Sequence, residues 1–340
     1  MQRAIALANQ GLGHTSPNPL VGCVIVYAPG TPEEKILAEG YHRQAGCAHA
    51  EVEALRAVDP PDLVYLPHST AYVTLEPCHH TGKTPPCTEA LLQAGLGRVV
   101  IGVKDPDYRV NGLGMNRLRE AGVQIEMADE ASQKEGAWVN RRYLTAATHQ
   151  RPYIILKWAE SSDGFVDGER SVAHPGPWPI TGPLANATVH RWRSQEDAIL
   201  VGIGTVLADN PQLTVREVDG PSPQRVVLGP ESPLDCGDFH VLKAPKALFW
   251  PSSEDLRGEL HVAFSNGWRS LFVEGGPTTH RLFLSENLWD EIRIFKAPHT
   301  LQEGVQAPSP PASAIPLPHG IFPSSFGSDS LHVYTREKWF

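Results

Sequence analysis

Short apolar runs alternate with stretches of helical periodicity through the first 148 residues. The periodic stretches predict helices over residues 2–10, 113–121 and 130–144, and helices that begin near His49 and Cys87. The apolar runs between them predict strands over residues 21–27, 36–39, 71–75, 98–103 and 123–127. Such an alternation is typical of an α/β domain whose sheet is covered by helices on both faces.

A second series of strands and helices begins after this region, where the helical pattern stops and the apolar run 153–158 starts. The chain has 340 residues, which is too long for one ordinary hydrophobic core, so we expect two domains, 1–148 and 152–340. In the second domain, strands 198–202 and 270–274 each lead into a glycine-containing turn and a helix. None of the motifs of the first half recurs in the second, which excludes an internal duplication.

Composition and charge exclude several classes of protein. Hydrophobic residues make up 41% of the chain and charged residues 20%, and no apolar run is long enough to span a bilayer. The formal net charge is −9, without the basic surface that a nucleic-acid-binding protein needs. The five cysteines are an odd number and fit a reducing compartment better than a disulfide framework. We therefore expect a cytoplasmic protein that acts on small molecules and binds neither nucleic acid nor membranes.

The residues with the most specific chemistry lie between His49 and Cys87. His49, Cys78 and Cys87 offer one imidazole and two thiols, which can hold a zinc ion and leave a fourth position for water. Zinc lowers the pKa of a bound water from about 16 to about 7, so that hydroxide forms at neutral pH. Glu51, two residues after the imidazole, is placed to remove the water proton and return it to a departing amine. We therefore predict that Glu51 is the general base and acid.

A structural zinc site is the alternative interpretation. It requires a fourth protein ligand, and the nearby candidates are His42, Cys47, His79 and His80. Structural sites usually draw on close pairs of cysteines or histidines and have no use for a neighbouring glutamate, so we favour a catalytic site.

These motifs resemble the zinc signature of the cytidine and deoxycytidylate deaminase superfamily, although the two cysteines are spaced C-x8-C where the general pattern is C-x-x-C. The longer loop, CHHTGKTPPC, is similar to the deaminase domain of the RibD family of bifunctional riboflavin-biosynthesis enzymes. Further segments match the same family: 17–22, 40–42 and 105–106. The resemblance implies a cytidine-deaminase-like, three-layer α/β/α fold for the first domain.

The same resemblance implies a substrate, a pyrimidinone that carries a ribose 5-phosphate. The residues that would contact it are Asn18, His42, His80, Lys83 and Asp105. Taken without the resemblance, Asn18 between two prolines is more simply a turn residue, and Lys83 beside a glycine a solvated loop charge. Loops do carry most binding residues, so the binding role stays our prediction.

Polar residues of the second domain gather at predicted strand ends. Gly275 and Gly276 lie between a strand and a helix start, where backbone N–H groups can approach a phosphate. Gly202 and Gly204 also follow a strand, but Leu207 stands where a dinucleotide fingerprint has its third glycine. We therefore reject a Rossmann site.

Three runs of the second domain resemble the reductase domain of the same family, which is related to dihydrofolate reductase. The runs are 157–164, 205–216 and 273–276. The resemblance implies a dihydrofolate-reductase-like α/β fold and hydride transfer from NADPH to C1′ of the opened ribosyl group. We also expect a homo-oligomer, a dimer or a tetramer. The resemblance implies NADPH contacts from Ala159, Trp178, Thr205, Asp209, Gly275 and Gly276. It implies substrate contacts from Arg193, Leu213, Arg216 and Glu274, and catalytic roles for Lys157, Asp209 and Glu274.

The second domain also departs from that family pattern. Leu228-Gly229-Pro230 replaces the usual Ile-Asp-Ser and removes two polar groups from the expected NADPH side. The proline-rich segment 174–181 shifts the alignment of Trp178 by about one residue, the stretch 249–274 looks short by part of a helix, and 307–318 reads as an extended, linker-like stretch.

The resemblance therefore predicts an enzyme that uses zinc and NADPH in two steps of riboflavin synthesis. The first step is zinc-dependent hydrolytic deamination of 2,5-diamino-6-ribosylamino-4(3H)-pyrimidinone 5′-phosphate, and the second is reduction of the ribosyl group of the product to ribityl. Two alternatives remain: a monofunctional zinc deaminase whose second domain only assembles subunits, and a zinc-stabilised interaction protein without turnover.

Overall fold

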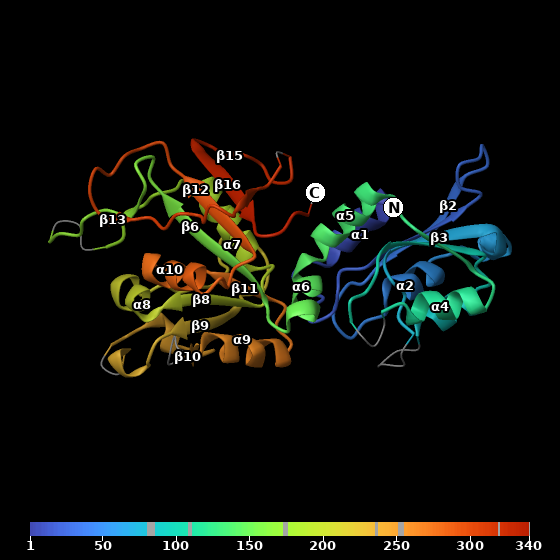
Figure 1. Ribbon diagram of the computed structural model, residues 1–340, viewed down its shortest axis with the longest axis horizontal. Coiled ribbons are helices and arrows are strands. Elements are labelled where there is room, and N and C mark those ends of the chain that lie inside the picture. Colours follow the sequence, from blue (N-terminus) through green and yellow to red (C-terminus); the bar gives the residue numbers. More distant parts are fainter. Residues whose placement is uncertain are drawn as a thin grey trace. The chain divides into compact units, whose positions relative to one another are not determined.

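The computed structural model describes most of the chain: residues 1–79, 86–107, 111–172, 176–234, 237–250, 255–318 and 320–339. Backbone contacts divide it into two compact units (Figure 1). Unit 1 holds residues 1–150 and Trp339, and unit 2 holds residues 151–338. No helix among the described residues is long and apolar enough to cross a membrane.

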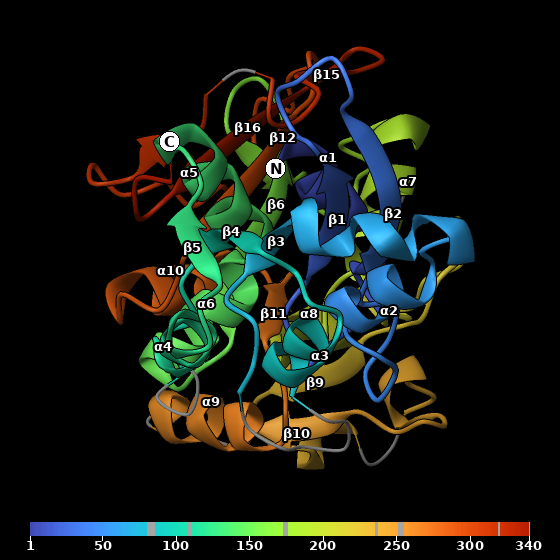
Figure 2. The same cartoon turned by 90° about the vertical axis from the view of Figure 1, so that its right-hand side faces the viewer.

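Unit 1 is built on a five-stranded sheet with the order β2-β1-β3-β4-β5, which Figure 2 shows from right to left. The strands are β1 (Gly22–Tyr27), β2 (Lys35–Tyr41), β3 (Ser69–Leu75), β4 (Arg98–Val103) and β5 (Gln124–Met127). Strand β1 is antiparallel to both neighbours, whereas β3, β4 and β5 run parallel. The carboxyl ends of β3 and β4 therefore meet at one edge of the sheet, and Cys78 and Asp105 follow these two ends.

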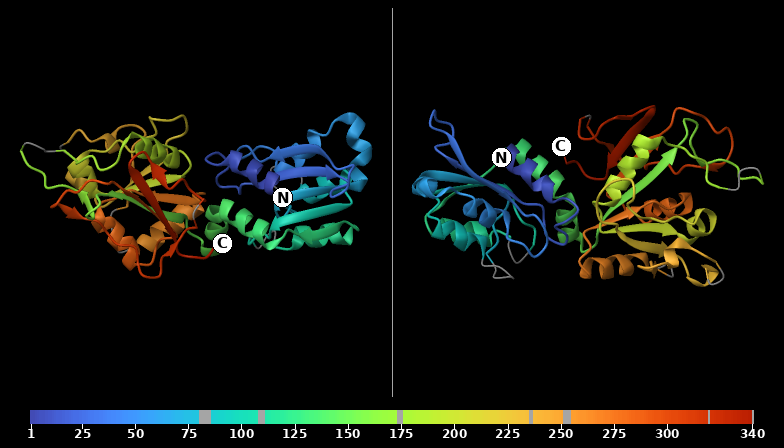
Figure 3. Two further views of the ribbon diagram at one scale, coloured as in Figure 1. Left: turned by 90° about the horizontal axis from the view of Figure 1, so that it is seen from above. Right: turned by 180° about the vertical axis from the view of Figure 1, so that it is seen from behind.

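Helices cover both faces of this sheet. On one face α1 (Gln2–Ala8) and α5 (Glu130–Val139) lie side by side, as Figures 1 and 3 show, and β1 contributes Val24 and Val26 to that core. The other face is covered by α2 (Ala50–Arg56), α3 (Cys87–Gln93) and α4 (Leu113–Glu120), and there β1 contributes Cys23 and Ile25. Side chains of a strand alternate between its two faces, so β1 supplies both cores. The predicted three-layer α/β/α arrangement is confirmed.

The single helix predicted over residues 130–144 is wrong, because the chain breaks at Asn140 into α5 and α6 (Arg141–His149). The Asn140 side chain accepts a hydrogen bond from the Leu20 backbone N–H and donates one to the Leu20 carbonyl, both at 2.8 Å. This long-range pairing holds the break, and hydrophobic periodicity carries no sign of it.

Unit 2 is built on a larger sheet with the order β10-β9-β8-β11-β6-β12-β16-β14, and β15 pairs with β16. The strands are β6 (Tyr153–Glu160), β8 (Ala198–Gly202), β9 (Gln224–Leu228), β10 (Leu248–Trp250), β11 (Ser270–Val273), β12 (Glu291–Lys296), β14 (Ile315–Pro316), β15 (Ser325–Phe326) and β16 (Asp329–Thr335). Strands β10, β9, β8, β11, β6 and β12 run parallel to one another. Strand β16 is antiparallel to its neighbours β12 and β14. A separate pair joins β7 (Phe165–Asp167) to β13 (Val305–Gln306).

Helices of unit 2 also pack on both faces of their sheet. Leu271 and Val273 of β11 face the core that includes α9 (Leu256–Ser265) and α10 (Pro277–Ser285). Phe272, on the opposite face, meets Trp192 of α7 (Pro183–Arg193), with ring centroids 6.4 Å apart. The short helix α8 (Ile203–Asp209) follows β8. The stretch 249–274, which looks short in the sequence, thus holds a ten-residue helix, α9.

Candidate active sites

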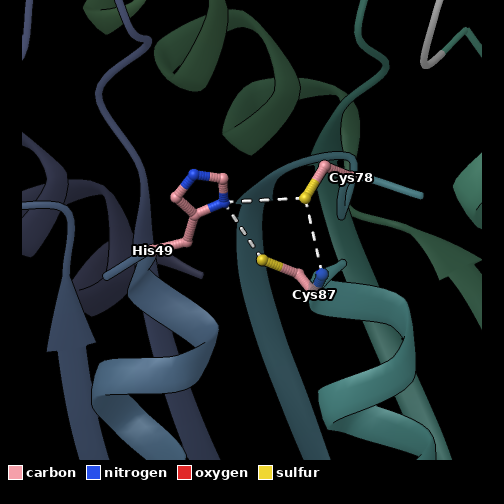
Figure 4. A group of neighbouring side chains, drawn as sticks. All are labelled: His49, Cys78 and Cys87. Carbon is pink, nitrogen blue, oxygen red and sulfur yellow. Dashed lines mark hydrogen bonds between the residues drawn. The ribbon is translucent and has the colours of Figure 1, made fainter. Parts of the chain in front are cut away.

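Three side chains of unit 1 converge on one point (Figure 4). His49 precedes α2, Cys78 follows β3, and Cys87 is the first residue of α3. His49 Nδ1 lies 3.1 Å from Cys87 Sγ and 3.6 Å from Cys78 Sγ. All three ligand atoms lie within 4.8 Å of one another, as the ligands of one metal ion must.

The distances and protonation of this cluster fit zinc. With Zn–N of about 2.0 Å and Zn–S of about 2.3 Å, a tetrahedral site separates nitrogen from sulfur by about 3.5 Å. Hydrogen bonds from the Cys87 thiol and from His49 lower the pKa of the Cys78 thiol to about 4, so that this sulfur is a thiolate, as a zinc ligand must be. The Cys87 backbone N–H also donates to Cys78 Sγ, at 3.4 Å.

No fourth protein ligand joins these three among the residues that the structure describes. His42 and His79 make other hydrogen bonds, and the Cys47 side chain is exposed. His80, the remaining candidate, lies outside the described residues. Three protein ligands of this kind are typical of a catalytic zinc site, which keeps an open position.

Glu51 lies in the first turn of α2 and is only 3% exposed. Burial raises its pKa to about 7, and the negative charge of Cys78 acts in the same direction. A zinc ion beside it would favour the carboxylate instead. Burial next to the three ligands gives Glu51 the position that the sequence predicted for a proton carrier.

Asn18 and His42 lie beside this cluster. His42 Nδ1 donates to the Ala48 carbonyl at 3.0 Å, so its Nε2 accepts from Asn18 Nδ2, also at 3.0 Å. Burial lowers the pKa of His42, which keeps the ring neutral at pH 7. The His42 ring meets the His49 ring edge-on, with centroids 5.4 Å apart.

Asp105 is buried at the carboxyl end of β4. Its carboxylate accepts hydrogen bonds from the Asp107 backbone N–H at 2.9 Å and from the Tyr143 hydroxyl at 3.1 and 3.2 Å. Burial raises the pKa of Asp105 to about 6. Tyr143, on α6, was not predicted, because no motif marks it. The predicted contacts His80 and Lys83 lie outside the described residues.

Unit 2 contains a cavity of about 820 Å³ at the carboxyl ends of β6, β8, β9 and β11. Open α/β sheets bind ligands at this edge, and the volume is that of a cofactor pocket. Seven predicted residues line it: Lys157, Ala159, Thr205, Asp209, Glu274, Gly275 and Gly276. Its described lining also includes Pro177, but not Trp178, and it includes Leu228, Gly229 and Pro230.

Glu274 lies at the centre of an ion-pair network in this cavity. Arg193 donates Nε and Nη2 to its two carboxylate oxygens at 2.7 and 3.0 Å, and Lys157 Nζ lies 3.7 Å away. Burial alone would raise the pKa of Glu274, but the charges of Arg193 and Lys157 lower it to about 2. Glu274 is therefore ionised at neutral pH. Burial lowers the pKa of Lys157, which makes this amine easier to deprotonate than an exposed lysine.

The other predicted substrate residues of unit 2 lie outside the lining of this cavity that the structure describes. Arg193 reaches it through Glu274, and its Nη1 donates to the Thr214 carbonyl at 3.2 Å. Leu213 is buried with a φ of +57°, and Arg216 is exposed. The backbone N–H of Arg216 donates to Nδ1 of His190, at 3.2 Å. His190 was not predicted, and neither were Asp167 and Arg170, which line the cavity beside Asp209.

Gly275 of the glycine pair is required by close packing. A Cβ on Gly275 would lie 2.7 Å from Cβ of Thr279, in the first turns of α10. The Gly276 N–H donates to the Thr205 hydroxyl at 3.1 Å, which joins the start of α10 to α8. Two predicted cofactor segments therefore meet on one side of the cavity.

Comparisons with known proteins assign each unit to a protein family. The family model described as the cytidine and deoxycytidylate deaminase zinc-binding region matches residues 1–103, and the model of the RibD C-terminal domain matches residues 152–311. The riboflavin biosynthesis protein RibD of Aquifex aeolicus is 36% identical over 90% of this chain and 88% of its own length. That of Escherichia coli K12 is 36% identical over 88% of this chain and 87% of its own length.

Solved structures give the same answer over nearly the whole chain. The diaminohydroxyphosphoribosylaminopyrimidine deaminase/5-amino-6-(5-phosphoribosylamino)uracil reductase of Thermotoga maritima has a TM-score of 0.84 at 30% identity, covering 98% of this chain and 97% of that one. RibD of Acinetobacter baumannii has a TM-score of 0.81 at 31% identity, covering 99% and 98%. The two predicted fold types are confirmed, and the chain belongs to the RibD family of bifunctional riboflavin-biosynthesis deaminases and reductases.

Proposed function

We propose that residues 1–148 deaminate 2,5-diamino-6-ribosylamino-4(3H)-pyrimidinone 5′-phosphate and that residues 152–340 reduce the product. The observation that carries the first step is the meeting of His49, Cys78 and Cys87 around one point, with Glu51 buried beside them. The second step is supported by the family match of residues 152–311 and by the cavity of unit 2, which predicted cofactor residues line. Both observations argue against the alternative in which the second domain only assembles subunits.

In the deaminase site the two cysteines and His49 would hold zinc, which as a Lewis acid makes a water molecule nucleophilic at neutral pH. Glu51 takes the proton of the attacking water and passes it to the leaving nitrogen. A C–O bond forms at C2 of the ring as the C–N bond breaks, and ammonia leaves. Asn18, His42 and Asp105 offer the hydrogen-bonding groups that orient the pyrimidinone, as the family resemblance implies.

In the reductase site NADPH would supply a hydride to C1′ of the opened ribosyl group. Its contacts would be Ala159, Thr205, Asp209 and the Gly275-Gly276 turn, and the family resemblance adds Trp178, next to the lining residue Pro177. Lys157 and Glu274 hold opposite charges at the reacting sugar, and Lys157, with its lowered pKa, is the group best suited to give up a proton there. Arg193 keeps Glu274 ionised and in place, and the exposed Arg216 offers a guanidinium that suits the substrate phosphate.

We further propose that the enzyme is a cytoplasmic homo-oligomer, a dimer or a tetramer. None of the cysteines that the structure describes forms a disulfide, as a reducing compartment requires.

The test of the deaminase step is Glu51→Gln. This variant keeps the three metal ligands but cannot carry a proton, so zinc content stays at one ion per chain while ammonia release falls by about 10²- to 10⁴-fold. Glu53→Gln is the matched control, since Glu53 lies on the same helix but its carboxylate pairs with Arg56 on the outer surface. Wild-type rates of ammonia release in zinc-loaded Glu51→Gln would eliminate the proposed proton carrier.

A further inference from the structure

Arg170 lies in the loop that follows β7 and lines the reductase cavity. No sequence motif predicted a functional residue in this loop. The Nε of Arg170 donates to Oδ2 of Asp167 at 2.8 Å, and its Nη1 donates to the Ala208 carbonyl, also at 2.8 Å. Its Nη2 donates to Oδ1 of Asp209. One guanidinium thus ties the β7 loop to the last turn of α8.

Arg170 balances the negative charge of two carboxylates that line the cavity. Three carboxylates line the cavity, from Asp167, Asp209 and Glu274, against two basic side chains, Lys157 and Arg170. Lys157 pairs with Glu274, at 3.7 Å, so Arg170 is the cation of the described lining that faces Asp167 and Asp209. Every lysine and arginine between residues 151 and 338 is described, so no undescribed lysine or arginine of unit 2 stands in for it.

Removal of this cation would leave two carboxylates together in a pocket that has to accept an anionic dinucleotide. The side chains of Asp167, Arg170 and Asp209 are 16%, 26% and 28% exposed, so solvent screens them only in part. Repulsion between the two carboxylates would turn Asp209 away from the position that Arg170 now fixes.

We propose that Arg170 is a positioning residue of the reductase site, which holds the Asp209 carboxylate in place and offsets its charge so that a phosphate-bearing nicotinamide dinucleotide can bind. The proposal rests on the proposed reductase function. Arg170 acts through Asp209 and through the charge of the cavity, and takes no part in hydride transfer itself.

The experiment is a binding titration of the full-length protein with NADPH and with NADH, followed by nicotinamide fluorescence, at low and high salt. For Arg170→Ala we expect the Kd for NADPH to rise at least tenfold at low salt, and the Kd for NADH to rise less because NADH lacks one phosphate group. Arg170→Lys keeps the charge and recovers part of the affinity. Arg191→Ala, which removes an exposed arginine of the same unit, is the matched control and should bind like the wild type.

A double-mutant cycle with Asp209→Asn separates this role from simple tethering of a loop. If Arg170 acts through Asp209, Arg170→Ala changes the NADPH Kd by less than about threefold in the Asp209→Asn background. Equal losses for NADH and NADPH without coupling to Asp209, or a Kd for Arg170→Ala within twofold of wild type, would overturn the proposal. Should the wild-type protein bind neither nucleotide, the proposed reductase function itself fails. If Arg170→Ala does not fold, Arg170→Gln, which also removes the charge, takes its place in both measurements.

Discussion

The two sites of this chain are assembled in different ways. The reactive groups of the deaminase site come from one stretch, residues 49–87, and sit at the starts of two helices and the end of one strand. The reductase cavity takes its lining from strand ends and loops spread between residues 157 and 305. A metal site demands particular residue types at short spacing, whereas a cofactor cavity demands charge balance and shape, which many sequences can provide.

The two sites also differ in how the charges of their buried carboxylates are balanced. In unit 1, burial raises the pKa of Glu51 to about 7 and that of Asp105 to about 6. In unit 2, Arg193 and Lys157 overcome the effect of burial and lower the pKa of Glu274 to about 2. The reductase site therefore carries its own counter-charges, whereas the deaminase site depends on an ion from outside the chain.

Removal of the metal should separate the two sites most completely. We expect Cys87→Ala, or treatment of the wild type with a zinc chelator, to reduce ammonia release to the limit of detection, because two ligands do not hold a catalytic zinc ion. NADPH oxidation with the deaminated intermediate should continue, since the described lining of the reductase cavity comes from residues 157–305 of unit 2. Both rates and the zinc content are measured on the same samples.

Cys47→Ala is the control for this experiment. Cys47 lies two residues before His49 and is exposed, so its removal should leave zinc content and ammonia release unchanged. Loss of zinc from Cys47→Ala would show that the ligand set is wrong, and loss of NADPH oxidation from Cys87→Ala would show that the two sites are not independent.

Glu274→Gln tests the reductase side of the comparison. The substitution leaves Arg193 and Lys157, both with side chains 13% exposed, without their shared counter-charge. Breaking a buried ion pair in this way costs about 3 kcal/mol of stability, and we expect NADPH oxidation to fall by at least about 100-fold. Ammonia release should stay at the wild-type rate. Glu303→Gln, an exposed change in unit 2, controls for the loss of one negative charge, and equal activity of the two variants would remove Glu274 from the site.

Most of the architecture of unit 1 follows from its sequence, for reasons that the structure makes clear. Its strands lie between two helical layers, so short apolar runs bounded by turn residues mark them well. His49, Glu51 and the cysteines are predictable because their chemistry restricts the residue types. The break at Asn140 is not predictable, because it depends on hydrogen bonds to Leu20, which is distant along the chain.

Less of the reductase site follows from its sequence. Thr205, Asp209 and the glycine pair are marked by resemblance, and the cavity includes them. Arg193, for which the resemblance implies a substrate contact, is paired with Glu274, a contact between residues 81 positions apart that no local pattern records. Arg170 likewise lies in a loop whose composition signals only a turn, and its function depends on partners brought in from α8.

The smallest effect we predict concerns the acids of unit 1 and the pH dependence of its stability. The pKa of Asp105 is about 6 in the folded protein against an ordinary 3.8, so the folded state holds an extra proton between these values and the free energy of unfolding falls as pH rises through this window. At pH 7 nearly the whole penalty applies, on the order of 3 kcal/mol. Asp105→Asn should therefore stabilise unit 1 at pH 7 but not near pH 4. Amide hydrogen exchange in β4 of the full-length protein measures this, and an equal difference between variant and wild type at both pH values would contradict it.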